Sequence, residues 1–217
     1  LSVVVNMAVL LVFIRSGHSS YDVTSIFTGK GAMLKLFPVW GAGVFTLHGI
    51  SYCMDIYRKE IEPEKNFLLV SQYICFFPCF SCGPILRFSD MSEQLRKPVI
   101  TSGKLAEGIK LMLIGFAEKL FLSDPMYEMW QHIRGVSTDS LSAACAWLGI
   151  IAFSFAFYYE LRAYSHIAQG IGSMLGFKLP DNFDLPFMSA GFNELIKRFA
   201  CTFYSWVRDY FYRPICR

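Results

Sequence analysis

The residues best suited to bind an anion lie in the closing stretch "FNELIKRFACTFYSWVRDYFYRP", where charged side chains stand among aromatic ones. Arg198 and Arg208 could hold an anionic carrier or the phosphates of a coenzyme, because a guanidinium group forms fork-shaped hydrogen bonds to phosphate. The same long side chains could equally extend to lipid headgroups. The local pattern leaves both interpretations open.

His166, in "AYSHIAQGIG", is the candidate for acid–base chemistry. An imidazole can accept a proton near neutral pH, and a carboxylate partner helps to hold it in place. Glu160 precedes it in the chain, but the sequence does not show that this carboxylate reaches the ring. His48 lies in an apolar run, where a neutral histidine bonded to a neighbouring helix is the commoner outcome.

The seven cysteines of the chain predict packing rather than metal binding. Cys79 and Cys82 have the spacing of metal ligands, but a structural zinc site takes four ligands and no second pair exists. We therefore expect no metal site.

The composition is that of a membrane protein. Apolar residues make up 54% and charged residues 17% of the 217 residues, and the mean hydropathy is +0.40, whereas soluble domains carry about 25% charged residues. The expected partner is therefore the lipid bilayer. A net charge of +3 spread along the chain forms no basic stripe, so we expect no nucleic-acid partner.

Three stretches without acidic or basic side chains are long enough to cross a bilayer: residues 36–54, 66–86 and 140–159. A spanning helix needs about 20 apolar residues and satisfies its own backbone hydrogen bonds. Because the runs are uniformly apolar rather than alternating, helices are favoured over barrel strands. We predict an all-α fold, a polytopic integral membrane helical bundle.

Prolines and a glycine interrupt the second of these stretches. Pro78, Gly83 and Pro84 would break a straight helix, which predicts either a broken or re-entrant segment inside the protein or a proline-kinked ordinary span. Beyond Tyr159 the apolar pieces become shorter. There we expect short re-entrant or interfacial helices in a protein-lined membrane cavity.

Residues 105–122 form a charged but largely apolar stretch. Glu107, Lys110 and Glu118 fall within one quarter of a helix circumference at about 100° per residue. This pattern predicts a helix that lies in the membrane interface, or one that packs its polar stripe against protein.

Four pieces of the chain, in order, resemble the membrane-bound O-acyltransferase family, especially its bacterial branch that acetylates alginate and other polysaccharides. They are "HGISYCMDIYRKEIEPEKNFLLVSQYICFFPCFSCGPILRF", "GFAEKLFLSDPMY", "AYSHIAQGIGSMLGFKLPDNFDLPF" and "FNELIKRFACTFYSWVRDYFYRPI". The resemblance implies a multi-helix membrane fold around a buried cavity. We expect residues 1–217 to be one partial acyltransferase domain, truncated at both ends.

The resemblance also implies the activity and its surroundings. An acyl group, acetyl in this branch, would pass from a thioester donor (acetyl-CoA or an acyl carrier) to a polysaccharide hydroxyl across the membrane, with no tightly bound cofactor. The expected location is the bacterial inner (cytoplasmic) membrane. An acyl carrier and an extracytoplasmic acyltransferase are the expected protein partners.

The resemblance assigns residues to a substrate passage, to the base and to the cavity wall. The segment with Pro78 and Pro84 would line the donor or acceptor passage. Ala200 stands where the family commonly has a histidine, and a more invariant histidine is expected beyond Arg217, so we expect this chain by itself to be inactive; His166 is the hypothetical substitute for the base. The cavity wall or interface would include Arg198, Trp206, Arg208, Asp209 and Tyr210.

Two other classes of function stay open. Ala200, which can neither bond nor titrate through its side chain, suggests a non-catalytic family member that binds or conducts an acyl carrier. Broken helices and interior histidines suggest a transporter or channel, which the four ordered motifs disfavour.

Overall fold

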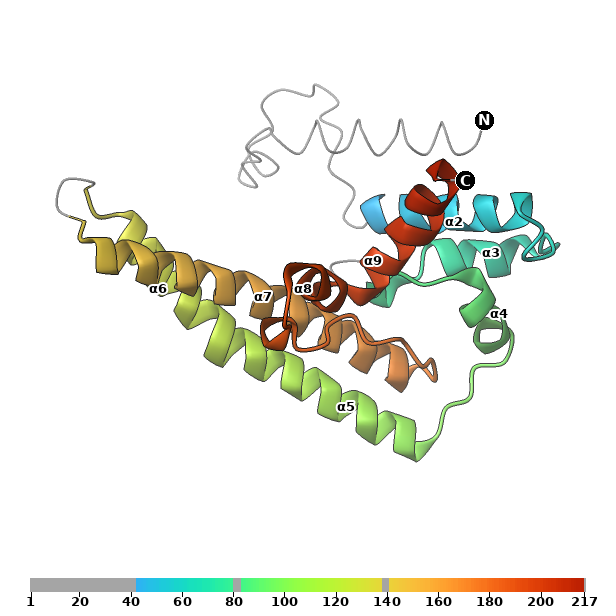
Figure 1. Ribbon diagram of the computed structural model, residues 1–217. Coiled ribbons are helices and arrows are strands. Elements are labelled where there is room, and N and C mark those ends of the chain that lie inside the picture. Colours follow the sequence, from blue (N-terminus) through green and yellow to red (C-terminus); the bar gives the residue numbers. More distant parts are fainter. Residues whose placement is uncertain (1–41, 80–82, 138–140, 217) are drawn as a thin grey trace, which may run out of the picture.

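The computed structural model describes residues 42–79, 83–137 and 141–216, and every regular element in these ranges is a helix (Figure 1). This agrees with the predicted all-α class. The chain order is α2 (Ala42–Tyr57), α3 (Phe67–Ile74), η2 (Phe77–Cys79), α4 (Phe88–Arg96), α5 (Ser102–Ala117), η3 (Glu118–Ser123), α6 (Asp124–Arg134), α7 (Ala143–Met174), η5 (Pro186–Met188), α8 (Phe192–Phe199), α9 (Cys201–Val207), η6 (Arg208–Tyr212) and α10 (Arg213–Ile215).

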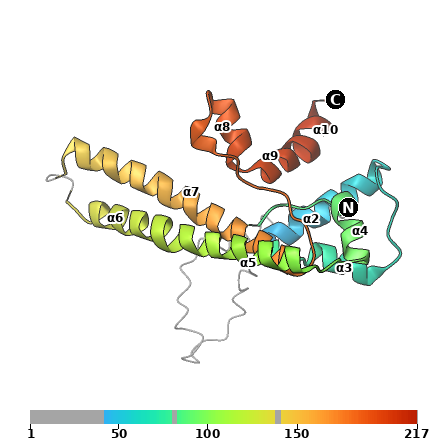
Figure 2. The ribbon, with the colours of Figure 1, turned by 90° about the horizontal axis from the view of Figure 1, so that it is seen from below.

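A long helical hairpin forms one arm of the molecule. Helix α5 continues through the π-helix η3 into α6, and α7 runs beside them in both views (Figures 1 and 2). Glycines allow α5 and α7 to approach closely: a Cβ atom on Gly108 would lie 2.6 Å from the carbonyl oxygen of Gly170, and one on Gly115 would lie 2.7 Å from that of Ala163. Small residues at such positions are typical of helices that pack in membranes.

Helix α7 is longer than the sequence predicted. It has 32 residues and, within the described ranges, is the helix long and apolar enough to cross a membrane. The Ser142 side chain caps its first turn by accepting from the backbone N–H of Cys145. The expectation that residues beyond Tyr159 form separate short pieces is wrong as far as Met174, because charged side chains on η3 pair with Glu160 and Arg162 and allow the helix to continue.

The predicted break in residues 66–86 is present. Asn66 caps α3 by accepting from the N–H of Leu68, the helix ends at Ile74, a short 3-10 turn follows, and residues 83–87 form no helix. Both Pro78 and Pro84 are buried. Of the predicted span 36–54, the part before residue 42 lies outside the described residues, and α2 extends past its predicted end to Tyr57.

The core beside the hairpin joins segments that are far apart in the sequence. Tyr73, which is fully buried, packs with Phe88 and Tyr52, so that α2, α3 and α4 meet there. Trp206 and Tyr210 pack on Ile50 in a second cluster. Helices α8, α9 and α10 lie on one side of the α5–α7 hairpin (Figure 2).

Candidate functional site

Asp209 is the centre of a group of arginines, which we call the Asp209 cluster: Arg58, Arg87, Asp209, Arg208 and Arg213. Asp209 lies in the π-helix η6, between α9 and α10. Nε of Arg208 lies 2.9 Å from its Oδ1 and Nη2 of Arg208 lies 3.3 Å from its Oδ2. Nη1 of Arg213 lies 3.2 Å from Oδ1, and Arg87 donates to Oδ2.

The arginines keep Asp209 ionised. Burial raises the pKa of this carboxyl, but the hydrogen bonds and charges of Arg208 and Arg87 outweigh burial and lower the pKa to about 2. The carboxylate side chain is 7% exposed, whereas the side chains of Arg208 and Arg213 are 45% and 65% exposed. The cluster therefore has a buried negative centre and an accessible positive rim.

Tyr210 and Arg58 connect the cluster to α2. The Tyr210 hydroxyl donates to Oδ1 of Asp55 over 2.7 Å, and Nη2 of Arg58 donates to the backbone oxygen of Asp209 over 2.9 Å. The guanidinium carbons of Arg58 and Arg87 lie 5.4 and 5.8 Å from the centre of the Tyr210 ring, which is within the range of cation–π attraction.

Four of the expected cavity residues therefore come together: Trp206, Arg208, Asp209 and Tyr210. Sequence reasoning left Arg58, Arg87 and Arg213 out of the site. The ion pair between Arg87 and Asp209 spans 122 positions. Only proximity in the fold could have revealed it.

Arg198, in contrast, belongs to a different place. Its Nη2 lies 2.7 Å from Oε1 of Glu194, one turn earlier on α8. This pair is half exposed and joins residues of the same helix, so the structure does not bring Arg198 into the Asp209 cluster through its ion pair.

Ala200 lies at the joint between α8 and α9. The next residue, Cys201, donates its N–H to the oxygen of Asn182, whose side-chain oxygen accepts from the Thr202 hydroxyl over 2.6 Å. The Thr202 hydroxyl in turn accepts from the N–H of Ile85 over 3.1 Å. The segment that follows Pro84 is thus bonded to the start of α9, and its role in a passage stays a prediction.

His166 has a carboxylate partner, but it is not Glu160. Nδ1 of His166 lies 2.8 Å from Oε2 of Glu118, and Nε of Arg162 lies 3.3 Å from Oε1 of Glu118. Glu118 is buried, whereas Glu107 and Lys110, which the sequence placed on the same stripe, are exposed. It follows the last residue of α5, the helix whose Gly108 and Gly115 face α7, and it begins the π-helix η3. π-Helices of one turn are frequent at functional sites.

Glu160 belongs to an adjoining network. Its carboxylate accepts from Nζ of Lys119 over 2.8 Å and from the Ser123 hydroxyl over 2.7 Å. Lys119 also lies 2.9 Å from Asp124. These contacts leave Glu118 as the group that orients His166.

His48 and the cysteine pair have simpler outcomes. Nε2 of His48 accepts from the N–H of Leu86 over 3.1 Å, and its ring stacks on that of Tyr73 at 5.1 Å. This matches a neutral histidine held in the core. Cys79 is fully buried, and Cys82 lies outside the described residues.

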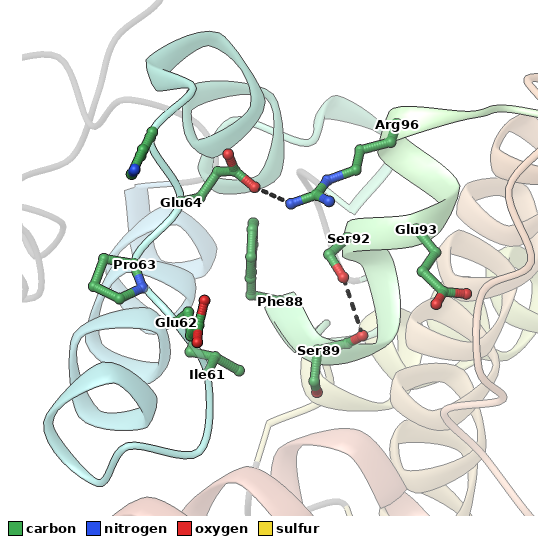
Figure 3. Close-up of a pocket in the computed structure, with 10 residues that line it drawn as sticks. Ile61, Glu62, Pro63, Glu64, Phe88, Ser89, Ser92, Glu93 and Arg96 are labelled. Carbon is green, nitrogen blue, oxygen red and sulfur yellow. Dashed lines mark hydrogen bonds and ion pairs between the residues drawn. The ribbon is translucent and has the colours of Figure 1, made fainter.

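A cavity of about 590 Å³ lies between the loop that joins α2 to α3 and helix α4 (Figure 3). Arg96 pairs with Glu64 across its mouth, while Glu62 and Glu93 also line it. Its charged lining consists of three acidic side chains, Glu62, Glu64 and Glu93, and two basic ones, Lys65 and Arg96. An anionic ligand therefore suits this cavity less well than it suits the Asp209 cluster.

Comparison with known proteins identifies the chain. Residues 64–217 match the membrane-bound O-acyltransferase family. The chain belongs to this family. It is 30% identical over 217 residues to the probable alginate O-acetylase AlgI of Pseudomonas aeruginosa, with 98% of this chain and 41% of that protein covered.

More distant relatives of this family member act on other polymers, according to their names. The chain is 24% identical to the peptidoglycan O-acetyltransferase of Helicobacter pylori, with 99% of the chain and 46% of that protein covered. It is 25% identical to the teichoic acid D-alanyltransferase of Lacticaseibacillus rhamnosus, with 87% and 48% covered. The chain spans less than half the length of these relatives.

Proposed function

We propose that the protein transfers an acyl group, acetyl in the first instance, from a thioester donor to a hydroxyl group of an envelope polysaccharide. The observation that supports this most is the match of residues 64–217 to the membrane-bound O-acyltransferase family. The relatives are named for the transfer of acyl groups to alginate, peptidoglycan and teichoic acid, and the one at 30% identity is named for alginate.

The reaction needs a base, since the acceptor hydroxyl must lose a proton as its oxygen attacks the thioester carbonyl and the thiolate leaves. His166 suits this task. When Nδ1–H donates to Glu118, as their 2.8 Å separation allows, Nε2 carries the lone pair that accepts the proton. Glu118 then holds the ring and stabilises the imidazolium that forms, as the third member of a triad does.

Ala200 supports this assignment within the chain. A methyl side chain offers no proton acceptor at the joint between α8 and α9, so we propose that the base is His166 or a histidine outside this chain. The protein as a whole would use acetyl-CoA or an acyl carrier on one side of the bacterial inner membrane. An extracytoplasmic acyltransferase on the other side is the proposed partner.

Acyl transfer by the full-length protein tests this function. Purified protein in liposomes would receive radiolabelled acetyl-CoA and short alginate or peptidoglycan fragments, and ester-linked label on the glycan would be counted with and without each acceptor. We expect label that is released by mild alkali and depends on the protein. Thioester turnover that never exceeds the rate in empty liposomes, with every acceptor and with an acyl-carrier donor, contradicts the proposal.

The second candidate is a non-catalytic family member that binds or conducts an acyl carrier, and Ala200 is the observation that favours it. Such a protein would bind the donor but would leave the thioester intact. A transporter, the third class, would move solute into liposomes with no acyl donor present. The assay above, run beside a flux measurement, separates all three.

A further inference from the structure

We propose that the outer arginines of the Asp209 cluster, Arg208 and Arg213, bind a phosphate group together with Arg87. The phosphate is carried either by the acyl donor or by an anionic lipid, and the chemistry of recognition is the same in both cases. For the donor, this inference rests on the proposed function.

The number of hydrogen-bond donors exceeds what Asp209 can accept. Each guanidinium group carries five N–H donors, and an ionised carboxylate has about four acceptor positions. Arg87, Arg208 and Arg213 make four contacts with Asp209. The carboxylate is therefore saturated, and the contacts of Arg208 and Arg213 with Asp209 use only three of the ten N–H donors of these two residues.

The unused donors are on the accessible side of the cluster. The exposed fraction rises from 33% for the Arg87 side chain to 65% for that of Arg213, while Asp209 stays buried. The exposed guanidinium groups neutralise the buried carboxylate, and their remaining N–H donors are on the solvent side. The rim is open to a ligand that approaches from outside.

The other acidic groups near the cluster lie beside Arg58, Tyr210 and Arg87, and of these Glu60 and Asp90 are exposed. Glu60 is 4.0 Å from Arg58, Asp55 accepts from Tyr210, and Asp90 lines a cavity beside Arg87. Within the described ranges, the ion pairs of the two outer arginines are with Asp209. The excess positive charge is therefore at Arg208 and Arg213.

There is room for a ligand next to the cluster. A cavity of about 220 Å³ opens beside Arg87 and is also lined by Lys178 and Asp90, whereas Arg208 and Arg213 are not among its lining residues. A phosphate group offers three or more oxygens in a tetrahedral arrangement. Several guanidinium forks can therefore bind it at once.

The test measures binding by the full-length protein in nanodiscs of phosphatidylcholine. The probes are free coenzyme A, which carries phosphates, and pantetheine, which does not. We expect the double variant Arg208→Gln/Arg213→Gln to bind coenzyme A about tenfold more weakly or worse, with pantetheine binding unchanged. The lysine pair Arg208→Lys/Arg213→Lys should lose less, because it keeps the charge but not the fork.

Arg134→Gln is the matched control, because Arg134 is also an exposed arginine but lies on α6, over the ring of Trp130 at 5.2 Å from its centre. It should bind coenzyme A as the wild type does. If the double variant does not fold, Arg213→Gln alone, which changes the most exposed member, replaces it.

A second arm identifies the source of the phosphate. Nanodiscs with phosphatidylglycerol are compared with those of phosphatidylcholine, and retained lipid is counted by native mass spectrometry. A lipid site predicts retention of phosphatidylglycerol that the double variant loses, with coenzyme A binding unaffected.

A folded double variant that binds coenzyme A and retains phosphatidylglycerol as the wild type does overturns the inference. Acyl transfer is measured separately. If the double variant loses ligand binding as expected but the wild type shows no acyl transfer, the proposed function is contradicted and the phosphate site is kept. If the wild type transfers acyl groups but the double variant binds its ligands unchanged, the phosphate site is contradicted and the proposed function is kept.

Discussion

At the scale of single residues, the pair of His166 and Glu118 shows how a local pattern can indicate the right group and the wrong partner. Glu160 is nearer in sequence and on the same helix, yet it is committed to Lys119 and Ser123. Glu118 reaches the ring from another helix. Its role would be positioning, because it acts on substrate only through His166.

We expect His166→Ala in the full-length protein to lower kcat for acyl transfer about 100-fold or more, since general-base catalysis contributes that much. Glu118→Gln should lower kcat about tenfold and leave KM unchanged, because it loosens the ring but not the substrate. Initial rates at several acceptor concentrations give both constants.

Glu160→Gln is the control, since it alters the Lys119 network without touching the bond between His166 and Glu118. A His166→Ala protein with the thermal midpoint and turnover of the wild type would remove His166 from the mechanism. A rise in KM as large as the fall in kcat for Glu118→Gln would point to a structural role.

At the scale of elements, the close contact of α5 and α7 depends on residues without side chains. Gly108 and Gly170 face one another, and Gly115 faces Ala163. This contact brings η3 against α7, so the geometry of Glu118 and His166 follows from it. Neighbouring positions on α5 face outwards and do not share the constraint.

Gly108→Ala should destabilise the protein by roughly 1–3 kcal/mol, the usual cost of overpacking, because its Cβ atom would lie 2.5 Å from Cγ of Met174 and 2.6 Å from the oxygen of Gly170. The matched change, Gly103→Ala on the same helix, meets only the side chain of Thr101 at 4.0 Å. It should be neutral or stabilise by up to about 1 kcal/mol through helix propensity.

Thermal midpoints in detergent, followed by tryptophan fluorescence, compare the two variants. Equal midpoints for Gly108→Ala and Gly103→Ala would show that the helices do not approach as closely as the structure describes. Acyl transfer by Gly108→Ala should fall with the loss of the η3 geometry, and Gly103→Ala should keep full activity.

At the scale of the whole molecule, Asp209 connects three distant parts of the chain. Arg58 at the end of the α2 region binds its backbone oxygen, Arg87 before α4 binds its carboxylate, and both sides meet over the ring of Tyr210. Losing the negative charge at this point should weaken the contact among all three parts.

The pH dependence of stability should reveal this charge. The folded-state pKa of Asp209, about 2, lies below its ordinary value of 3.8, so the ionised form stabilises the fold above pH 3.8, and this contribution is lost as the pH falls through about 2. The shift corresponds to roughly 2 kcal/mol. Asp209→Asn should be less stable than the wild type at neutral pH, and the difference should shrink between pH 4 and pH 2.

Thermal midpoints of both proteins across this range measure the difference. Asp124→Asn is the control. It removes one carboxylate partner of Lys119 but leaves the other, Glu160, so its thermal midpoint should change with pH as that of the wild type does. A constant difference between Asp209→Asn and the wild type from pH 7 to pH 2 would mean that the arginines do not stabilise the ionised carboxylate.

The helical class, the family and the break between α3 and α4 could all be predicted from the sequence. Each depends on residues that are close together in the chain: long apolar runs for the helices, prolines for the break, and short motifs for the family. Through the resemblance the sequence also indicated Arg198, Trp206, Arg208, Asp209 and Tyr210 as one group.

Which side chains form ion pairs and hydrogen bonds with one another became visible only in the folded structure. It placed Arg87 and Arg58 on Asp209, separated Arg198 with Glu194, and gave His166 to Glu118 rather than Glu160. The physical reason is that ion pairs and hydrogen bonds act over a few ångströms in space, whatever the separation along the chain. Glu118 and Asp209 both lie in π-helical turns, which no local pattern in the sequence predicted.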